Sequence, residues 1–259
     1  MACLIIGFAT VSVAHGDPSG PVSWTGFIDP DQGSMVTGGG WGRMTLLTNG
    51  NWLCVSTAYP QGQNSYLQLY QSSDDAKSWS YVCNVKESGR VLDNGELITL
   101  TNGTLLLTMR SLILSNSYHL PVYESTNNGL AWVYLSNIDS NEGVNVGGLW
   151  EPKFYMLQNG VLAAFYSNES HPGYSQMISE RISTNNGASW GPEIWAVAQA
   201  GGGSLRPGMP QICQMATGNY ILVYEIVNIG NADVYYNISS NGMDWPSTLG
   251  THIPCQHAG

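Results

Sequence analysis

The sequence repeats one unit of about 55 residues four times, and a period of this length constrains the fold more than any single motif does. Each unit contains an apolar segment, an Asn-Gly or Thr-Gly turn, a second apolar segment and a polar turn that leads to a tryptophan. The turn glycines lie 29, 29, 30 and 27 residues before the tryptophans. These residues are Gly50, Gly103, Gly160 and Gly218, followed by Trp79, Trp132, Trp190 and Trp245.

Two short apolar segments joined by a tight turn are typical of a β-hairpin, and no segment has the 3.6-residue apolar period of a helix. Repeated hairpins of this length predict four-stranded blades around a central channel, which is a β-propeller. We therefore predict an all-β chain with a single propeller domain at 17–259. Its blades are expected at roughly 40–86, 93–138, 148–197 and 206–250.

The polar turns before the tryptophans share a further pattern. The first reads Ser72-x-Asp74-x-Ala76-x-x-Trp79, and the fourth is interpreted as Ile238-x-Ser240-x-Gly242-x-x-Trp245. Together the four turns resemble the Asp-box of sialidase-type propellers, a BNR-type repeat. Since Asp-boxes lie on the side away from the active site in that superfamily, we expect these residues to be structural.

The composition indicates which partners suit the chain. Its formal net charge is -10 and it has only 8 Lys and Arg, which argues against nucleic acid because affinity for phosphates depends on those cations. Trp and Tyr number 9 and 14. Aromatic rings stack on sugar faces while carboxylates and amides bind hydroxyls, so this composition favours neutral sugars.

Residues 1–16 contain an apolar run that ends in small residues, as a secretory signal peptide does. No Lys or Arg precedes the run, so a first β-strand is the alternative, and the run is too short to cross a bilayer. Asn-x-Ser/Thr triplets at Asn102, Asn168 and Asn237 favour a secretory route. We predict a secreted monomer without membrane partners.

The five cysteines and five histidines show no metal-ligand spacing, so neither a metal nor another cofactor is expected. Loss of Cys3 with a signal peptide would leave four cysteines. Of these, Cys54 and Cys213 lie in apolar strand patterns, which favours buried free thiols.

Equivalent positions of different blades lie at equivalent heights on a propeller, so the turn glycines define a common frame. Counting back seven to twelve residues from each glycine reaches the start of the innermost strand, and counting forward seven reaches the end of the second strand on the same rim. The first count selects Arg43, Asp93, Asn94, Glu151 and Arg206; the second selects Thr57, Arg110, Ser167 and Glu225.

This rim therefore gathers five or six of the 26 charged residues in the chain. Charges near a propeller axis are partly desolvated and must pair or bind a ligand, which predicts a site; a structural ring of arginine–carboxylate pairs is the alternative. Two carboxylates are the minimum for a glycosidase, one protonating the leaving oxygen and one attacking or activating water. Glu151 and Glu225 are the candidates, and Tyr224 could hold Glu225 or face the opposite side of the sheet.

Around these residues the sequence resembles the exo-acting arabinanases of glycoside hydrolase family 93. The similarity covers roughly residues 40–250 and is most specific in Gly-Leu-Trp-Glu-Pro at 148–152, Arg-Pro-Gly-Met-Pro at 206–210 and Tyr-Ile-Leu-Val-Tyr-Glu at 220–225. Shorter matches are the strand at 161–167 and Tyr-Ser-Gln at 174–176. The resemblance implies a six-bladed, sialidase-like propeller that releases arabinobiose from the end of α-1,5-linked arabinan.

The resemblance also implies roles for individual residues. Glu225 would be the nucleophile of a retaining mechanism and Glu151 the acid/base. Arg43 and Arg206 fall on positions that line the pocket, while Trp150 and Tyr166 resemble its wall, blade packing being the alternative for Trp150. The full set predicted to bind substrate is Arg43, Asp93, Asn94, Arg110, Trp150, Tyr166, Gln176, Arg206 and Tyr224.

Three features depart from the family pattern. Asn168 stands where the family has an acidic residue, and Arg43 lacks the proline or tyrosine usual around it. Four blades are visible where the family has six, and a ring without two blades would expose two sheet edges and open the pocket. We therefore expect a truncated product or fragment, which could be inactive as given.

Two other functions fit parts of this pattern. An exo-sialidase or related exo-glycosidase would use Arg43, Arg110 and Arg206 to bind a substrate carboxylate, although Arg43 is not followed by the Ile-Pro usual in sialidases. A non-catalytic carbohydrate-binding propeller would keep the sugar site without turnover.

Overall fold

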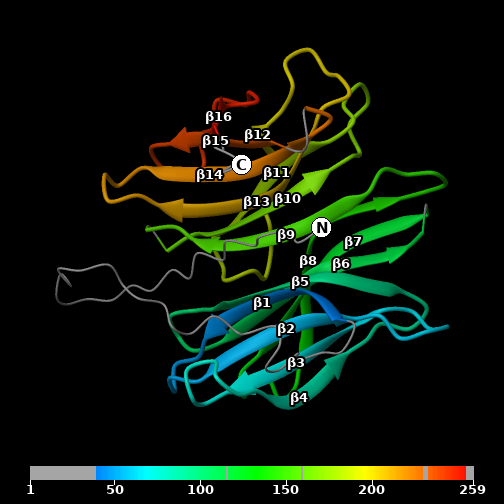
Figure 1. Cartoon of the computed structure of the whole chain (residues 1–259), viewed down its shortest axis with the longest axis vertical. Helices are drawn as coiled ribbons and strands as arrows, with labels where there is room; N and C mark the ends of the chain where they lie inside the picture. Colours follow the sequence, from blue (N-terminus) through cyan, green and yellow to red (C-terminus); the bar gives the residue numbers. More distant parts are fainter. Residues whose placement is uncertain (1–38, 115, 159, 230–232, 255–259) are drawn as a thin grey trace, which may run out of the picture.

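The computed structural model describes residues 39–114, 116–158, 160–229 and 233–254. These residues form four antiparallel four-stranded sheets, and the described ranges contain no helix (Figure 1). The possible signal peptide, Cys3 and Cys255 lie outside them. The prediction of an all-β chain built from propeller blades is confirmed.

Each sheet is an up-and-down meander of consecutive strands. The first comprises β1 (Gly39–Leu46), β2 (Trp52–Ala58), β3 (Tyr66–Ser72) and β4 (Ser80–Val85). The second comprises β5 (Val91–Thr99), β6 (Leu105–Ile113), β7 (Ser117–Ser125) and β8 (Val133–Glu142). The third comprises β9 (Leu149–Met156), β10 (Leu162–Asn168), β11 (Met177–Ser183) and β12 (Ile194–Val197). The fourth comprises β13 (Arg206–Gln214), β14 (Tyr220–Val227), β15 (Asp233–Ser239) and β16 (Thr251–His252).

The first strand of each sheet lies innermost. β1 contacts β5, β5 contacts β9 and β9 contacts β13, so the first strands of successive blades are neighbours. In Figure 1 the four sheets follow one another in chain order. Residues that begin these strands are therefore brought together from distant parts of the sequence.

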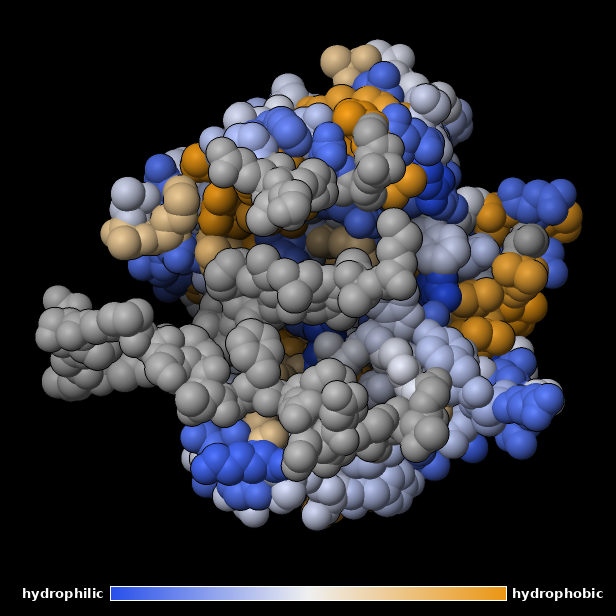
Figure 2. All heavy atoms as spheres, in the orientation of Figure 1, coloured by the Kyte–Doolittle hydropathy of each residue, from blue (hydrophilic) through white to orange (hydrophobic). Residues whose placement is uncertain are grey.

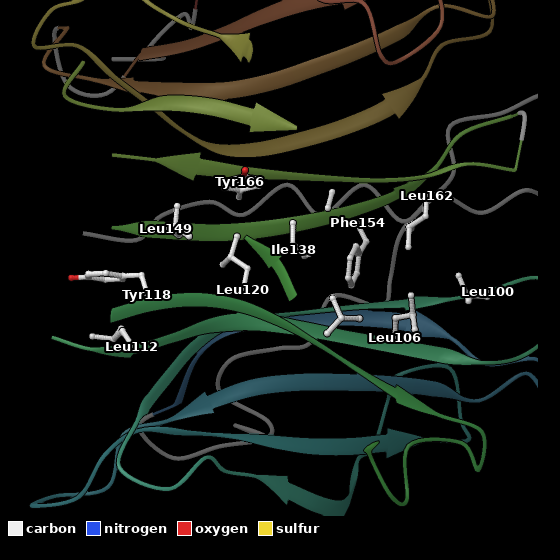
Figure 3. Close-up of a cluster of buried hydrophobic side chains, with 12 residues drawn as sticks. Leu100, Leu106, Leu112, Tyr118, Leu120, Ile138, Leu149, Phe154, Leu162 and Tyr166 are labelled. Atoms are coloured by element: carbon white, nitrogen blue, oxygen red, sulfur yellow. The ribbon is translucent and has the colours of Figure 1, made fainter. Parts of the chain in front are cut away.

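The hydrophobic core is divided among the gaps between successive sheets. Leu53 and Leu107 belong to the cluster between the first two sheets, and Phe165 and Leu222 to that between the last two. Figure 3 shows the middle cluster, in which Phe154 of β9 lies among leucines of the second sheet. On the face in Figure 2, apolar side chains form separate groups on a largely polar described surface. Burial between blades, at about 2 kcal/mol for each leucine, thus holds the sheets together.

The polar turns are closed by side-chain hydrogen bonds to the backbone. In the second repeat Ser125 Oγ accepts from Gly129 N at 3.0 Å, and Asn127 Oδ1 accepts from Ala131 N at 3.0 Å. The first and third repeats show the same bonds.

The fourth turn is one residue shorter than the other three. Ser239 Oγ accepts from Gly242 N at 2.9 Å, and Asn241 Oδ1 accepts from Asp244 N at 2.8 Å. The alignment of Ile238 and Ser240 with the serine and Asp/Asn positions of the other turns is therefore wrong. The hydroxyl of Ser239 and the amide of Asn241 set the register, and the deletion lies between them and Trp245.

A buried carboxyl joins the third and fourth blades. Trp245 Nε1 donates to Glu180 Oε2 at 2.8 Å, and the side chain of Glu180 is fully buried. Its other oxygen has no hydrogen-bond partner among the described residues. Burial raises the pKa of Glu180 from 4.5 to about 8, so the carboxyl holds its proton at neutral pH.

This carboxyl makes stability depend on pH. Between pH 4.5 and about 8 the folded chain binds more protons at Glu180 than the unfolded chain, so the free energy of unfolding falls as pH rises through that window. We expect Glu180→Gln to remove this fall and to be more stable than the wild type above the window, by a few kcal/mol. Thermal denaturation below, within and above the window measures it, and parallel pH profiles for the two proteins would contradict the assignment.

The glycosylation triplets differ in accessibility. Asn168 and Asn237 are buried, and their Nδ2 atoms donate to Glu193 Oε1 at 2.8 Å and to Thr248 O at 3.0 Å. Neither amide can accept a glycan in the folded chain. Asn102 lies exposed in a turn, and the secretory route stays a prediction.

The described cysteines are free thiols. Cys54 is buried, which raises the pKa of its thiol to about 12, while Cys83 and Cys213 are partly buried. The expectation of buried free thiols is confirmed for Cys54, whereas Cys213 is free but only partly buried. Within the described ranges, no helix is long and apolar enough to span a bilayer.

Candidate active site

The innermost strand of every blade carries a β-bulge at the same place. The bulged residues, here called the bulge row, have φ angles of 57°, 51°, 55° and 54°. They are Trp41, Asn94, Glu151 and Met209. Positive φ is costly for residues with a side chain, and a bulge redirects the side chain it carries. The fold thus directs four side chains toward one rim by the same local distortion.

Glu151 occupies the bulge of β9 and is held by two donors. Its Oε2 accepts from Ser167 Oγ at 3.0 Å and from the backbone N–H of Met209 at 2.8 Å. Ser167 lies near the end of β10 in the same blade, whereas Met209 is the bulge residue of the next blade. The carboxylate is therefore fixed between the third and fourth blades.

Glu225 lies in β14 opposite Gly208 of β13. Partial burial raises the pKa of Glu225, and the nearby charge of Glu151 raises it further. Gly208 directly precedes Met209, whose N–H binds Glu151. The structure therefore brings the two predicted catalytic carboxyls together around one short segment of β13.

Gly208 lets two polar side chains approach this segment closely. A Cβ at this position would lie 2.8 Å from Gln176 Nε2 and 3.4 Å from Glu151 Oε2. Gln176 is itself buried, and its Nε2 donates to Pro207 O at 2.8 Å. A side chain at Gly208 would thus displace either the amide or the carboxylate.

Arg206 continues the polar group beside Gln176. It donates to Gln176 Oε1 at 2.6 Å and forms an ion pair with Glu169. Glu169 Oε2 also accepts from Gly148 N at 2.9 Å. Glu169 was not predicted from the sequence, although it directly follows Asn168, which stands where an acidic residue was expected.

A second polar group lies between the first three blades. Asp93 accepts from Thr57 and Tyr59, both at 2.9 Å, and pairs with Arg110 at 2.9 Å. The Arg110 guanidinium lies 4.1 Å from the ring centre of Trp150, which directly precedes Glu151. Predicted residues Asp93, Arg110 and Trp150 are thus linked to one another at this rim, and Asn94 lies beside them in the bulge row, with its backbone N–H donating to Asp93.

Arg43 lies outside the bulge row and farther from the rim than predicted. Its Nε is 3.8 Å from Glu96 Oε2, and Lys153 Nζ is 2.7 Å from Glu96 Oε1. The prediction that Arg43 shares the height of Glu151 is wrong because it stands two residues beyond the bulge, where it joins this charged group. Glu96 and Lys153 were missed, although each also lies seven residues before its turn glycine.

The prediction that Tyr166 and Tyr224 contact a substrate is wrong. Their exposed fractions are 0% and 1%. Tyr166 lies in the core between the second and third blades (Figure 3), and its hydroxyl donates to Asp139 at 2.5 Å. Tyr224 donates to Leu249 O at 2.8 Å from the opposite side of the strand to Glu225. Strand alternation buries both rings.

The titratable residues of this rim do not form a metal site. In the part of the chain that the structure describes, no group of three or more His, Cys, Asp or Glu side chains could hold a metal ion. The charged groups instead bind one another and backbone N–H groups.

Comparison with known proteins gives related folds. A family model described as a BNR repeat-like domain matches residues 41–201. No curated protein sequence matches the chain. Among solved structures, the α-L-arabinanase of Penicillium chrysogenum, complexed with arabinobiose, is similar with a TM-score of 0.71 and 25% identity over 83% of this chain and 65% of that one.

Two further structures share the fold at lower identity. The α-L-arabinofuranosidase of Fusarium graminearum, of glycoside hydrolase family 93 and also complexed with arabinobiose, has a TM-score of 0.70 and 22% identity, with the same coverage. The Hadza microbial sialidase Hz136 has a TM-score of 0.58 and 9% identity over 83% of this chain and 47% of that one. The chain thus spans 65% of the length of the first two structures.

Proposed function

We propose that this chain, which belongs to the BNR repeat-like domain family, is a retaining glycoside hydrolase that releases arabinobiose from the end of α-1,5-linked arabinan. One observation carries the proposal: Glu151 and Glu225, 74 positions apart in the sequence, meet at one segment of β13, where Met209 N donates to Glu151 Oε2 and Gly208 lies opposite Glu225. The likeness to an arabinanase complexed with arabinobiose supports the choice of sugar.

The two carboxyls would act in two steps. Glu225 attacks the anomeric carbon while Glu151 donates its proton to the glycosidic oxygen, so that the C–O bond breaks and a glycosyl ester forms on Glu225. Glu151 then takes a proton from water, which attacks the same carbon and releases the disaccharide. Retention needs a separation of about 5 to 5.5 Å between the carboxyls.

The surrounding donors support this chemistry. Ser167 Oγ and Met209 N hold Glu151 in one orientation, which reduces the ordering required when a substrate binds. Gln176, fixed by Arg206 and Pro207 O, holds its amide against Gly208, on the side where Glu151 Oε2 also lies. We propose that these groups bind sugar hydroxyls.

The arginines argue against a sialidase. A sialidase needs guanidinium groups that converge on the carboxylate of its substrate. Here each of the three candidates already lies beside a carboxylate of the chain. The pairs are Arg43 with Glu96, Arg110 with Asp93, and Arg206 with Glu169.

Incubation of the chain with linear α-1,5-arabinan tests the proposal. We expect arabinobiose as the first product detected by chromatography with mass detection, and no cleavage of a sialyl-linked dye. Binding of arabinan without any product would support a carbohydrate-binding propeller instead, and cleavage of the dye would support a sialidase.

A further inference from the structure

The first blade presents two aromatic rings at the rim that holds the carboxyl pair. Trp41 belongs to the bulge row and so lies at the height of Glu151. Its φ of 57° is rare for a residue with a large side chain, and glycine would adopt it without strain. Strain of this kind persists mainly where the side chain serves a function.

Tyr59 follows β2 and is fixed in place, yet 48% of it is exposed. Its hydroxyl donates to Asp93 Oδ1 at 2.9 Å and also faces the indole of Trp41. Its ring lies over Gly40, where an added Cβ would be 3.2 Å from Cε2. An aromatic ring that is held at its hydroxyl and along one side, and open elsewhere, offers a preorganised stacking surface.

Contacts connect this surface to the carboxyl pair. Asp93, which holds Tyr59, pairs with Arg110, and Arg110 lies over the ring of Trp150. Trp150 is covalently adjacent to Glu151. A ligand bound at Tyr59 therefore lies on the same rim as the reacting groups, but on a different blade.

We propose that Trp41 and Tyr59 form a distal sugar-binding subsite, which holds the part of a neutral oligosaccharide that lies beyond the bond to be cleaved. Aromatic faces bind the apolar faces of sugar rings, and Asp93 with Arg110 can bind hydroxyls at their edges. Because that carboxylate and guanidinium neutralise each other, the subsite suits uncharged sugars. The inference rests on the proposed function for the choice of arabinan.

Calorimetric titration of the Glu225→Gln protein with arabinobiose and arabinohexaose tests the subsite without turnover. Adding Tyr59→Ala, or Trp41→Gly at a position where glycine relieves the strain, should weaken arabinohexaose binding about tenfold and leave arabinobiose binding unchanged. Tyr81→Ala is the matched control, since Tyr81 is 55% exposed on the outer strand β4. It should change neither affinity.

In otherwise wild-type protein, Tyr59→Ala should raise KM for linear arabinan about tenfold and leave kcat unchanged. Unchanged arabinohexaose affinity in both variants, an equal loss in Tyr81→Ala, or no arabinohexaose binding by the parent protein would overturn the subsite. If the wild-type chain cleaves no arabinan, while the Glu225→Gln protein loses arabinohexaose binding when Tyr59 is replaced, the proposed function would be refuted and the subsite would stand.

Discussion

Replacing Glu225 with glutamine is expected to lower kcat for linear α-1,5-arabinan by at least about 10⁴-fold. Glutamine has nearly the shape of glutamate, but its amide cannot form the glycosyl ester on which the retaining route depends. Binding of arabinobiose should persist, because the carboxyl of Glu225 accepts no hydrogen bond from the residues that the structure describes. Initial rates of disaccharide release, with calorimetric binding of arabinobiose, measure both effects.

The matched control is Glu142→Gln, whose carboxyl is 57% exposed at the end of β8 and pairs with His119. It should retain wild-type kcat. Because burial raises the pKa of Glu225, its ionised form is disfavoured in the folded chain, so Glu225→Gln should not lower the melting temperature at neutral or higher pH. If a folded Glu225→Gln protein kept a tenth of the wild-type kcat, the nucleophile assignment would be wrong.

Replacing Glu151 with glutamine is expected to have an effect that depends on the leaving group. With arabinan, loss of the proton donor should lower kcat by about 10²–10⁴-fold. With an aryl arabinobioside whose phenolate leaves without a proton, the first step should survive and the second should become limiting. Azide, a nucleophile that needs no general base, should then restore turnover. An equal loss of rate on both substrates, without rescue by azide, would contradict the acid/base role.

The same substitution should change the pH profile. The charge of Glu151 contributes to the raised pKa of Glu225, so removing that charge should lower the pKa of Glu225 toward its usual range. The acidic limb of the profile for cleavage of the aryl arabinobioside should therefore move to lower pH. An unmoved limb would indicate that the two carboxyls are too far apart to act on one sugar.

The two carboxyls differ in environment in a way that bears on their roles. Glu151 accepts hydrogen bonds from two donors, whereas burial raises the pKa of Glu225 and so favours its protonated form. The form of Glu225 that attacks substrate is the ionised one, so its environment in the unliganded chain opposes its proposed role. Coupled carboxyls share protons, and an acid/base group changes its protonation state in every cycle. Position relative to the anomeric carbon, rather than charge in the free protein, therefore assigns the roles.

The repeat made the blades predictable from the sequence, because the spacing of glycine turns and tryptophans follows directly from the geometry of a blade. It also predicted which strands meet at one rim, and the forward count placed Arg110, Ser167 and Glu225 correctly opposite the start of the innermost strands. The one-residue deletion before Trp245 was not visible in the sequence. Counting back from Trp245 assigns the serine position to Ile238, whereas the hydrogen bond from Gly242 N to Ser239 Oγ shows that Ser239 occupies it.

The distance of individual side chains from the rim could not be predicted. The bulges interrupt the regular alternation of side chains between the two faces of each innermost strand. No glycine marks the bulged position itself, although Gly or Pro follows each one. They are Gly42, Gly95, Pro152 and Pro210. A count of seven residues back from the turn glycine in every blade would have grouped Arg43 with Glu96 and Lys153 and separated it from Glu151. Burial of Tyr166 depends on the neighbouring blade, which no local pattern describes.

The site of covalent attachment tests the central claim most directly. The wild-type and Glu151→Gln proteins are mixed with an aryl arabinobioside, quenched in acid, digested and analysed by mass spectrometry. We predict an arabinobiosyl group on the peptide that contains Glu225, more abundant in Glu151→Gln because its second step is slow. Attachment to Glu151 in the wild type, or no adduct in either protein while the aryl substrate is cleaved, would contradict a retaining mechanism with Glu225 as the nucleophile.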